Sequence, residues 1–192
     1  MHLAIVLGVP RGGVLTALAA AQKLSIRCAI IGTKRLVAPH NREITIGAIM
    51  DSGEVYLNSE LIEALQIPPE YVETEKRKQT EQFKSKSSAY HLQSADIKNK
   101  FVVLIDDGAA SGATLTVALR HIKTLNPKYT IVGLPVAPKQ TVRLLENEAD
   151  KVKCIFQPRN DEFNCVENFY EDYSPVTDNQ VADAIRTIND SL

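Results

Sequence analysis

The chain has 192 residues, 44% of them hydrophobic and none of them Trp, and its formal net charge is −1. This composition is typical of one globular domain that buries a continuous core, and it excludes a disordered chain. The sequence has no block of like charges and no apolar run of membrane-spanning length, so we expect neither nucleic acid nor a membrane as a partner.

The three cysteines predict neither a metal site nor a redox pair, because they are odd in number and widely spaced. Cys28 and Cys154 lie in apolar runs and are predicted core thiols, whereas nothing marks Cys165 as reactive. The N-terminus carries no charged lead before its apolar segment, so a secretory signal is not expected. Together these features favour a reducing, cytoplasmic location.

Apolar, β-prone runs predict five strands, at 3–8, 27–32, 101–106, 130–136 and 152–156. Helical patterns lie between most of these runs, at 12–24, 113–125 and 139–149. Strands that alternate with helices predict an α/β fold, in which a mainly parallel central sheet is flanked by helices. Without internal repeats or linkers, residues 1–192 are predicted to form a single domain.

The segment between the second and third predicted strands differs from this alternation. In residues 46–57, Asp51-Ser52-Gly53 separates two short β-prone runs and predicts a hairpin. A short helix is expected over 59–65. The polar stretch from Pro68 to about Ser88 is rich in helix formers, which predicts a long exposed helix that frays through its serines.

Residues 101–117 carry most of the functional information. An apolar strand ends on Asp106 and Asp107, small residues follow from Gly108 to Ala113, and a helix begins after them. Small residues let a ligand approach the backbone, and the N-terminus of a helix offers unpaired N–H groups to an anion such as phosphate. The two carboxylates suit sugar hydroxyls and a hydrated divalent cation. This combination predicts a sugar phosphate site.

Two familiar nucleotide loops are excluded by the letters of this segment. A P-loop requires Lys after its last glycine, whereas Ala113 follows Gly112. A dinucleotide fingerprint requires three glycines, and only Gly108 and Gly112 are present. An ordinary strand-to-helix turn would explain the glycines but not the adjacent carboxylates.

The segment Ile105-Asp106-Asp107-Gly108-Ala109-Ala110-Ser111-Gly112-Ala113-Thr114 resembles the phosphoribosyl-pyrophosphate motif of type I phosphoribosyltransferases. Val9-Pro10-Arg11-Gly12-Gly13-Val14 resembles the pyrophosphate loop of one bacterial group in that family, the largely uncharacterised predicted phosphoribosyltransferases. Similarity to this group covers nearly the whole chain, including Pro135-Val136-Ala137-Pro138 and Phe169-Tyr170-Glu171-Asp172-Tyr173-Ser174.

The resemblance implies a Mg²⁺-dependent enzyme that transfers the ribose 5-phosphate group from phosphoribosyl pyrophosphate to a small acceptor, such as a nitrogenous base or an amine. Asp106 and Asp107 would bind the ribose hydroxyls and steady Mg²⁺, mostly through water. The loop of Gly108, Ala109, Ala110, Ser111, Gly112, Ala113 and Thr114 would grip the 5′-phosphate. A second copy of the chain is also expected as a partner, in a homodimer.

The leaving pyrophosphate would meet a second loop and a pair of cationic side chains. Gly12 and Gly13 would expose backbone N–H groups to it, Arg11 would donate to it, and Pro10 would belong to the same binding loop. A cis peptide is expected at Arg11–Gly12. Lys34 and Arg35 follow the second predicted strand and would bind the same group, but the sequence does not decide which of them points inward.

The resemblance also implies two parts that lie over the site, a mobile flap and a hood. The flap would consist of residues 44–95, with Lys76, Arg77, Lys84 and Lys86 as its cations, and the hood of residues 157–176. Phe169 and Tyr170 of the hood could stack a planar acceptor, or they could form an apolar cap. Ala110 stands where enzymes that salvage 6-oxopurines carry an acidic residue, so hypoxanthine and guanine are not expected as acceptors.

Two other functions stay open at this stage. One is a non-catalytic regulator of the same fold that binds ribose phosphates or nucleotides. The other is a hydrolase that acts on sugar phosphates without an acceptor. The retained Arg11-Gly12-Gly13 loop and the Lys34-Arg35 pair favour chemistry on pyrophosphate.

Overall fold

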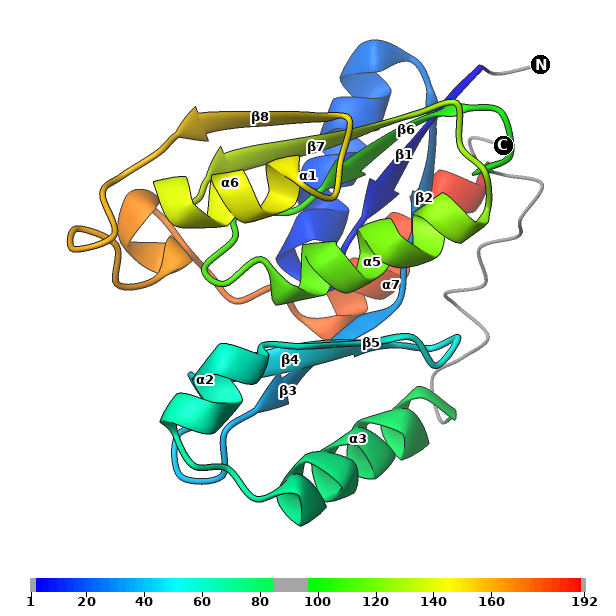
Figure 1. The fold of residues 1–192 in the computed structure, drawn as a ribbon. Helices are drawn as coiled ribbons and strands as arrows, with labels where there is room; N and C mark the ends of the chain where they lie inside the picture. Colours follow the sequence, from blue (N-terminus) through cyan, green and yellow to red (C-terminus); the bar gives the residue numbers. More distant parts are fainter. Residues whose placement is uncertain (1–2, 85–96, 191–192) are drawn as a thin grey trace.

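The computed structural model describes residues 3–84 and 97–190 (Figure 1). Its main sheet has five parallel strands in the order β2-β1-β6-β7-β8. The strands are β1 (Ala4–Gly8), β2 (Arg27–Ile30), β6 (Phe101–Ile105), β7 (Tyr129–Val136) and β8 (Lys151–Phe156). All five predicted strands are confirmed, and so is the α/β class.

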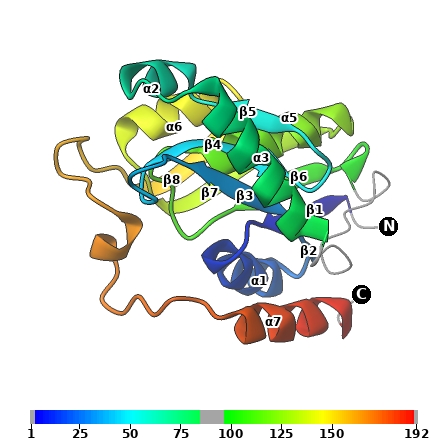
Figure 2. The same ribbon diagram turned by 90° about the horizontal axis from the view of Figure 1, so that it is seen from below.

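Helices cover both faces of this sheet, as Figure 2 shows from below. The helices α1 (Gly12–Leu24) and α7 (Asp178–Asp190) lie on one face. The helices α5 (Ala113–Thr124) and α6 (Lys139–Glu146) lie on the other. The predicted helices at 12–24, 113–125 and 139–149 are confirmed, with α6 ending a few residues early. None of the helices in the described part of the chain is both long and apolar enough to cross a membrane.

The order of the strands places a topological switch at the centre of the sheet. β1 and β6 pair in parallel along their full length. The chain leaves β1 through α1 towards β2 and leaves β6 through α5 towards β7, so the two connections diverge. In open α/β sheets such a switch leaves a crevice at the carboxyl ends of the strands, and ligands bind there.

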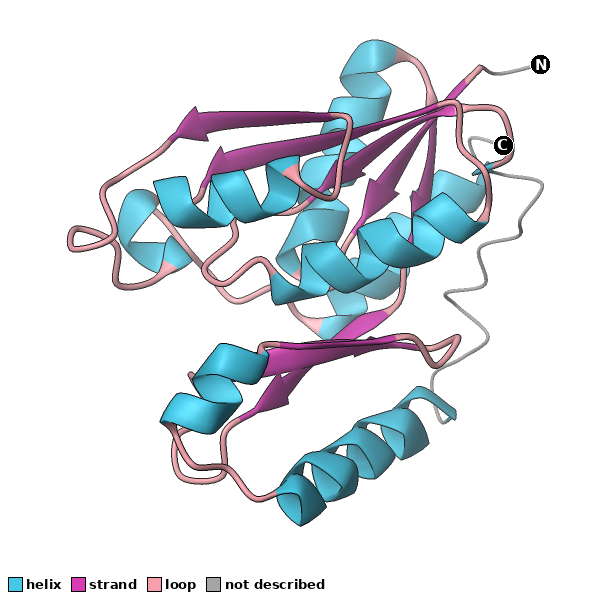
Figure 3. Ribbon diagram, in the orientation of Figure 1, coloured by secondary structure: helices cyan, strands magenta, loops and turns pink. Residues whose placement is uncertain are grey.

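A second, antiparallel sheet lies beside the first in the order β3-β4-β5 (Figure 1), and Figure 3 shows the strands of both sheets in magenta. Its strands are β3 (Thr33–Val37), β4 (Thr45–Met50) and β5 (Val55–Leu57). The predicted hairpin is confirmed as β4–β5, and Gly53 in its turn has a φ of 99°. Helix α5 packs on one face of this small sheet and α3 (Pro69–Lys84) on the other, while the short α2 (Ser59–Ala64) follows β5.

The prediction of an exposed helix after Pro68 was wrong for one side of that helix. Val72, Glu75, Gln79 and Phe83 of α3 are buried, and their spacing of three and four residues places them on one side. Val72 and Phe83 pack into a core with Leu36, Ile46 and Ile49 of the small sheet. The predicted fraying at 85–88, and Lys86 with it, lies outside the described residues.

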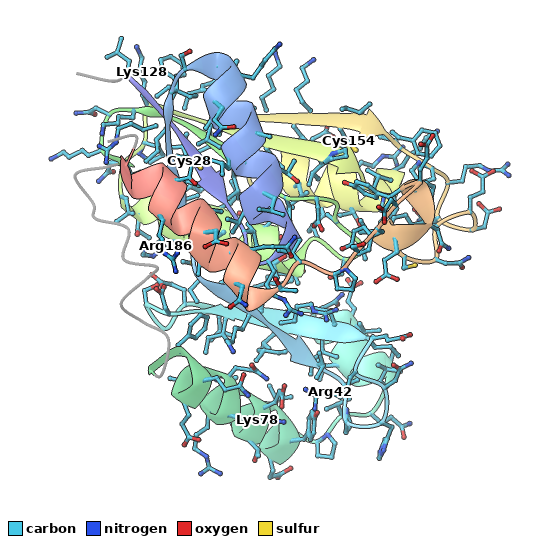
Figure 4. The ribbon with its side chains drawn as sticks, turned by 180° about the vertical axis from the view of Figure 1, so that it is seen from behind. Cys28, Arg42, Lys78, Lys128, Cys154 and Arg186 are labelled. Carbon is cyan, nitrogen blue, oxygen red and sulfur yellow. The ribbon has the colours of Figure 1, made fainter. Side chains whose placement is uncertain are left out.

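The cysteines occupy separate places in the fold. Cys28 lies on β2 and Cys154 on β8, the two opposite edges of the main sheet, as Figure 4 shows from behind. Both pack against the core, although only Cys28 is fully buried, and its burial raises the pKa of its thiol to about 11. All three cysteines are free thiols.

Candidate functional site

The loops that follow β1 and β6 are in direct contact at the switch point. A Cβ atom built on Gly12 would lie 1.8 Å from Asp107 Oδ2, and one built on Gly13 would lie 2.6 Å from Asp106 Oδ1. No side chain fits at either position. Gly12 and Gly13 are therefore required for the contact with the two carboxylates, in addition to any role towards a ligand.

The cis peptide of this region lies at Pro10–Arg11, so the predicted position, Arg11–Gly12, was wrong by one residue. The reason is that the sheet ladder extends one residue beyond β1: the Val9 N–H donates to Ile105 O at 3.2 Å. The turn consequently begins at Pro10. Arg11 is exposed and directly precedes α1, and its carbonyl accepts from the Val14 N–H at 3.2 Å.

Asp106 is buried, with 8% of its surface exposed, and the neighbouring Asp107 is half-buried. Burial is the main cause that raises the pKa of Asp106 well above its usual range, and the adjacent Asp107 charge raises it further. The Asp107 N–H donates to Asp106 Oδ1 at 3.0 Å, and the Gly13 backbone also stabilises the Asp106 carboxylate. Such a pair attracts cations and hydroxyl donors.

Two tyrosines of the C-terminal segment cap the second carboxylate. The Tyr173 hydroxyl donates to Asp107 Oδ2 at 2.9 Å, and the Tyr170 hydroxyl donates to the backbone oxygen of Asp107. Burial and the nearby Asp107 raise the pKa of both tyrosines, which therefore remain protonated donors at neutral pH. Sequence reasoning assigned Tyr170 to acceptor stacking and missed the hydroxyl contacts of both residues.

The small-residue loop after the acidic pair is held from three sides. The Ala109 N–H donates to Val136 O at 3.0 Å, and the Thr141 hydroxyl donates to Ala110 O. A Cβ atom on Gly108 would lie 2.5 Å from Val166 of the hood. β7, α6 and the hood thus fix this loop, and only a glycine fits at position 108.

The loop ends at the start of α5. Gly112 has a φ of 72°, a conformation that favours glycine, and its carbonyl accepts from the Thr116 N–H at 2.8 Å. The Ala113 N–H approaches Ser111 Oγ at 3.4 Å. The acidic pair and the loop are therefore contiguous at the end of β6, and a helix N-terminus stands beside them. This arrangement suits an anion and hydroxyl groups on one ligand.

Lys34 and Arg35 were expected at the carboxyl edge of the main sheet, but they lie inside β3. The Lys34 Nζ donates to Gln82 Oε1 at 2.6 Å and lies 5.6 Å from the centre of the Phe83 ring, so Lys34 is directed towards α3. Arg35 pairs across the sheet with Ala48, which belongs to the core under α5. Because successive side chains alternate between faces, Arg35 is directed towards the main body instead.

Phe169 belongs to an aromatic cluster within the hood. Its ring stacks on Phe163 at 5.4 Å between centroids, and it contacts Phe156 of β8 at 5.5 Å. The short helix η2 (Val166–Phe169) carries it there. Of the two interpretations left open by the sequence, this cluster favours the apolar cap for Phe169.

A cavity of about 580 Å³ opens beside the loop. It is lined by the junction of β5 and α2 (residues 56–60), by Ala110 and Ser111, by the first turns of α6, and by Asn160. The lining residues on its α2 and α6 sides are separated by 78 to 88 positions in the sequence. Nothing in the sequence pattern indicated that they would meet.

Several known proteins are similar to this chain. Residues 33–172 match the family model described as phosphoribosyl transferase domain. Two curated Mycobacterium tuberculosis proteins, MT0597 and Rv0571c, both provisionally named phosphoribosyl transferases, are 25% identical over 179 residues. That alignment covers 92% of this chain but 40% of each relative, so the chain spans less than half of their length. The crystal structure of TT1426 from Thermus thermophilus is 28% identical, with a TM-score of 0.70 over 96% of this chain and 88% of that one.

Proposed function

The chain belongs to the phosphoribosyl transferase domain family, and from that premise we propose that it is a Mg²⁺-dependent phosphoribosyltransferase. It would move the ribose 5-phosphate group of phosphoribosyl pyrophosphate to a nitrogen of a small acceptor. The observation that carries the proposal is the contact between two loops. β6 is followed by the Asp106-Asp107 pair and its small-residue loop, and Gly12 and Gly13 lie against both carboxylates.

The proposed reaction needs positioned charge and no covalent nucleophile. The bond from ribose C1 to pyrophosphate breaks with its electron pair on pyrophosphate, the acceptor nitrogen forms the new bond to C1, and that nitrogen then loses its proton. Asp107 would accept from the ribose hydroxyls, and the N–H groups at the start of α5 would hold the 5′-phosphate. Arg11 and Arg35 would meet the negative charge that develops on pyrophosphate.

The acidic pair also fits Mg²⁺. A cation would stabilise the charged form of the buried Asp106 beside a second carboxylate, and the raised pKa of Asp106, caused mainly by its burial, supports this proposal. The described residues hold no cluster of three or more His, Cys, Asp or Glu side chains. Mg²⁺ keeps several of its waters and therefore needs few protein ligands, so Asp106 and Asp107 would be enough to hold it, mostly through water. When bound, Mg²⁺ would neutralise charge on the leaving group.

The test is pyrophosphate release from phosphoribosyl pyrophosphate and Mg²⁺ in the presence of a panel of purines, pyrimidines and amines. Release that depends on the acceptor supports the transferase. Tight binding without release would support a non-catalytic regulator, and breakdown without an acceptor would support a hydrolase. Replacing both Asp106 and Asp107 with Asn should weaken ligand binding while the fold stays intact, and unchanged affinity in calorimetry would count against the site. The homodimer and the cytoplasmic location remain predictions.

A further inference from the structure

The cavity beside the loop has the size of a small-molecule site, since such sites are roughly 300–1,000 Å³. Ala110 and Ser111 belong both to its wall and to the loop that the proposed function assigns to the sugar phosphate. A molecule in the cavity would therefore lie next to the proposed sugar phosphate. We propose that this cavity is the acceptor chamber, and that it selects a neutral, planar acceptor with amide-type edges through Asn58, Gln140 and Asn160. This inference rests on the proposed function.

The charge of the lining argues against an anionic acceptor. None of the described side chains that line the cavity is Lys, Arg or His, and Glu60 adds a carboxylate. A carboxylate-bearing acceptor would lose its hydration without gaining a cationic partner, which is costly. The first turn of α6 offers backbone N–H groups at the cavity wall, and a neutral carbonyl oxygen can accept from them. The partial positive charge of this helix end also suits an anion, but the Glu60 carboxylate in the same lining opposes one.

Three amide side chains from separate segments converge on the chamber. Asn160 Nδ2 donates to Gln140 Oε1 at 2.8 Å, which directs Gln140 Nε2 and Asn160 Oδ1 to other partners. Asn58 Oδ1 accepts from the Leu61 N–H at 3.0 Å, so its Nδ2 is the group left to donate to a ligand. Donors and an acceptor in the lining of one cavity match a heterocycle that carries both a carbonyl or ring nitrogen and an N–H group.

The remaining walls suit a flat ring. Leu57, Pro138 and Leu144 supply apolar surface, and Tyr56 supplies an aromatic ring that is itself held 5.1 Å from the Arg120 guanidinium. The hood aromatics are less available for this purpose, because Phe169 already packs with Phe163 and Phe156. The acceptor would thus be held by the α2 and α6 sides of the site.

The experiment measures equilibrium binding separately from turnover. Uracil, adenine and nicotinamide serve as neutral probes, and orotate and quinolinate as carboxylate-bearing probes of similar size. Binding to the whole chain is followed by ligand-observed NMR in the presence of ribose 5-phosphate. At least one neutral probe should bind more tightly than both anions, and Gln140→Ala and Asn160→Ala should each weaken it about tenfold, as expected for a lost hydrogen bond.

Asn164→Ala is the matched control, because Asn164 is an exposed amide of the same segment that does not line the cavity. It should leave probe binding unchanged, and none of the three variants should alter ribose 5-phosphate affinity more than twofold. Preference for orotate or quinolinate, no binding of any neutral probe, or unchanged binding in Gln140→Ala and Asn160→Ala would overturn the proposal. Pyrophosphate release tests the transferase separately. Release with an anionic acceptor would support the transferase and overturn the acceptor chamber. Probe binding that depends on Gln140 and Asn160, without release, would support the chamber and count against the transferase.

Discussion

Tyr173 and Asp107 are 66 positions apart in the sequence, and their side chains meet at 2.9 Å through a hydrogen bond from the tyrosine hydroxyl to Oδ2. This bond joins the C-terminal hood to the acidic pair at the end of β6. Tyr170 makes a second connection to the backbone oxygen of the same residue. The hood is therefore anchored on a carboxylate that is also a proposed ligand group.

Tyr173→Phe should lower the free energy of unfolding by about 1.5–3 kcal/mol, as expected for a hydrogen bond to a charged group. Tyr170→Phe removes a bond to a neutral carbonyl and should cost less, about 0.5–1.5 kcal/mol. Urea denaturation of the two variants and the parent measures both values. Equal losses, or no loss in Tyr173→Phe, would contradict the role given to Asp107.

Asp106 should make the ligand-free protein less stable as pH rises. Its pKa is raised in the folded chain, mainly by burial, so between the ordinary carboxyl pKa and the raised value the folded state binds more protons than the unfolded state. Stability from this group is thus present at low pH and is lost as pH rises through that window. Glu148 has the opposite sign: burial would raise its pKa, but hydrogen bonds from Arg120 and Lys123 lower it.

Asp106→Asn isolates the Asp106 contribution from carboxyls of opposite sign. The variant should lack the loss of stability with rising pH that the parent shows, and the difference between their pH profiles of unfolding free energy is the quantity to measure. Parallel profiles across the acid range would show that Asp106 titrates normally.

Arg35→Ala should reduce turnover far more than Lys34→Ala does. Arg35 lies on the face of β3 towards the main body, whereas Lys34 is directed towards Gln82 and Phe83 of α3. We expect at least a tenfold loss of kcat/KM for Arg35→Ala, which corresponds to about 1.4 kcal/mol of transition-state stabilisation. Lys34→Ala should instead lower thermal stability slightly. The reverse order in steady-state kinetics would reassign the two cations.

Gly12→Ala should disrupt the acidic pair, because its Cβ atom would lie 1.8 Å from Asp107 Oδ2. Calorimetry should show a loss of ribose 5-phosphate binding together with a lower unfolding temperature. Gly133→Ala on β7 is the control, since its Cβ atom would make an ordinary contact at 3.5 Å with Ile105. Normal binding by Gly12→Ala would mean that the two loops separate in solution.

Hypoxanthine and guanine should give no pyrophosphate release. Ala110 has no acidic group to assist proton transfer with a base, and its carbonyl is engaged by the Thr141 hydroxyl. Ala110→Asp should give release with hypoxanthine or guanine only if the hydrogen bond from the Thr141 hydroxyl to the backbone oxygen of residue 110 is kept. Robust release by the parent chain with either base would refute the interpretation of Ala110.

The sequence predicted the main sheet well because its strands are apolar, β-prone runs that end in recognisable turns, and this holds even for β8, which is largely exposed. β3 was missed because Thr33–Val37 follows β2 after two residues and carries Lys34 and Arg35 at its centre. The buried face of α3 was missed because two of its members, Glu75 and Gln79, are polar and bond to each other at 2.8 Å. Their burial depends on tertiary packing, which local periodicity does not report.

The same limit applies to the site. Asp106, Asp107 and the small residues after them were identified because they are adjacent in sequence and share one strand end. The hydroxyl of Tyr173, the support from Thr141 and the amides of the cavity arrive from distant segments. Their contributions follow from strand order and loop length, and no short motif records them.

Helix α5 is shared by both parts of the molecule: its first residue ends the loop that is proposed to bind phosphate, and its side supports the small antiparallel sheet. This helix therefore sets the spacing between that loop and the small sheet. In the proposed transferase, substitutions in the surrounding turns would alter the choice of acceptor without changing that spacing. Chains built on this helix could then differ in acceptor while they bind the same proposed donor.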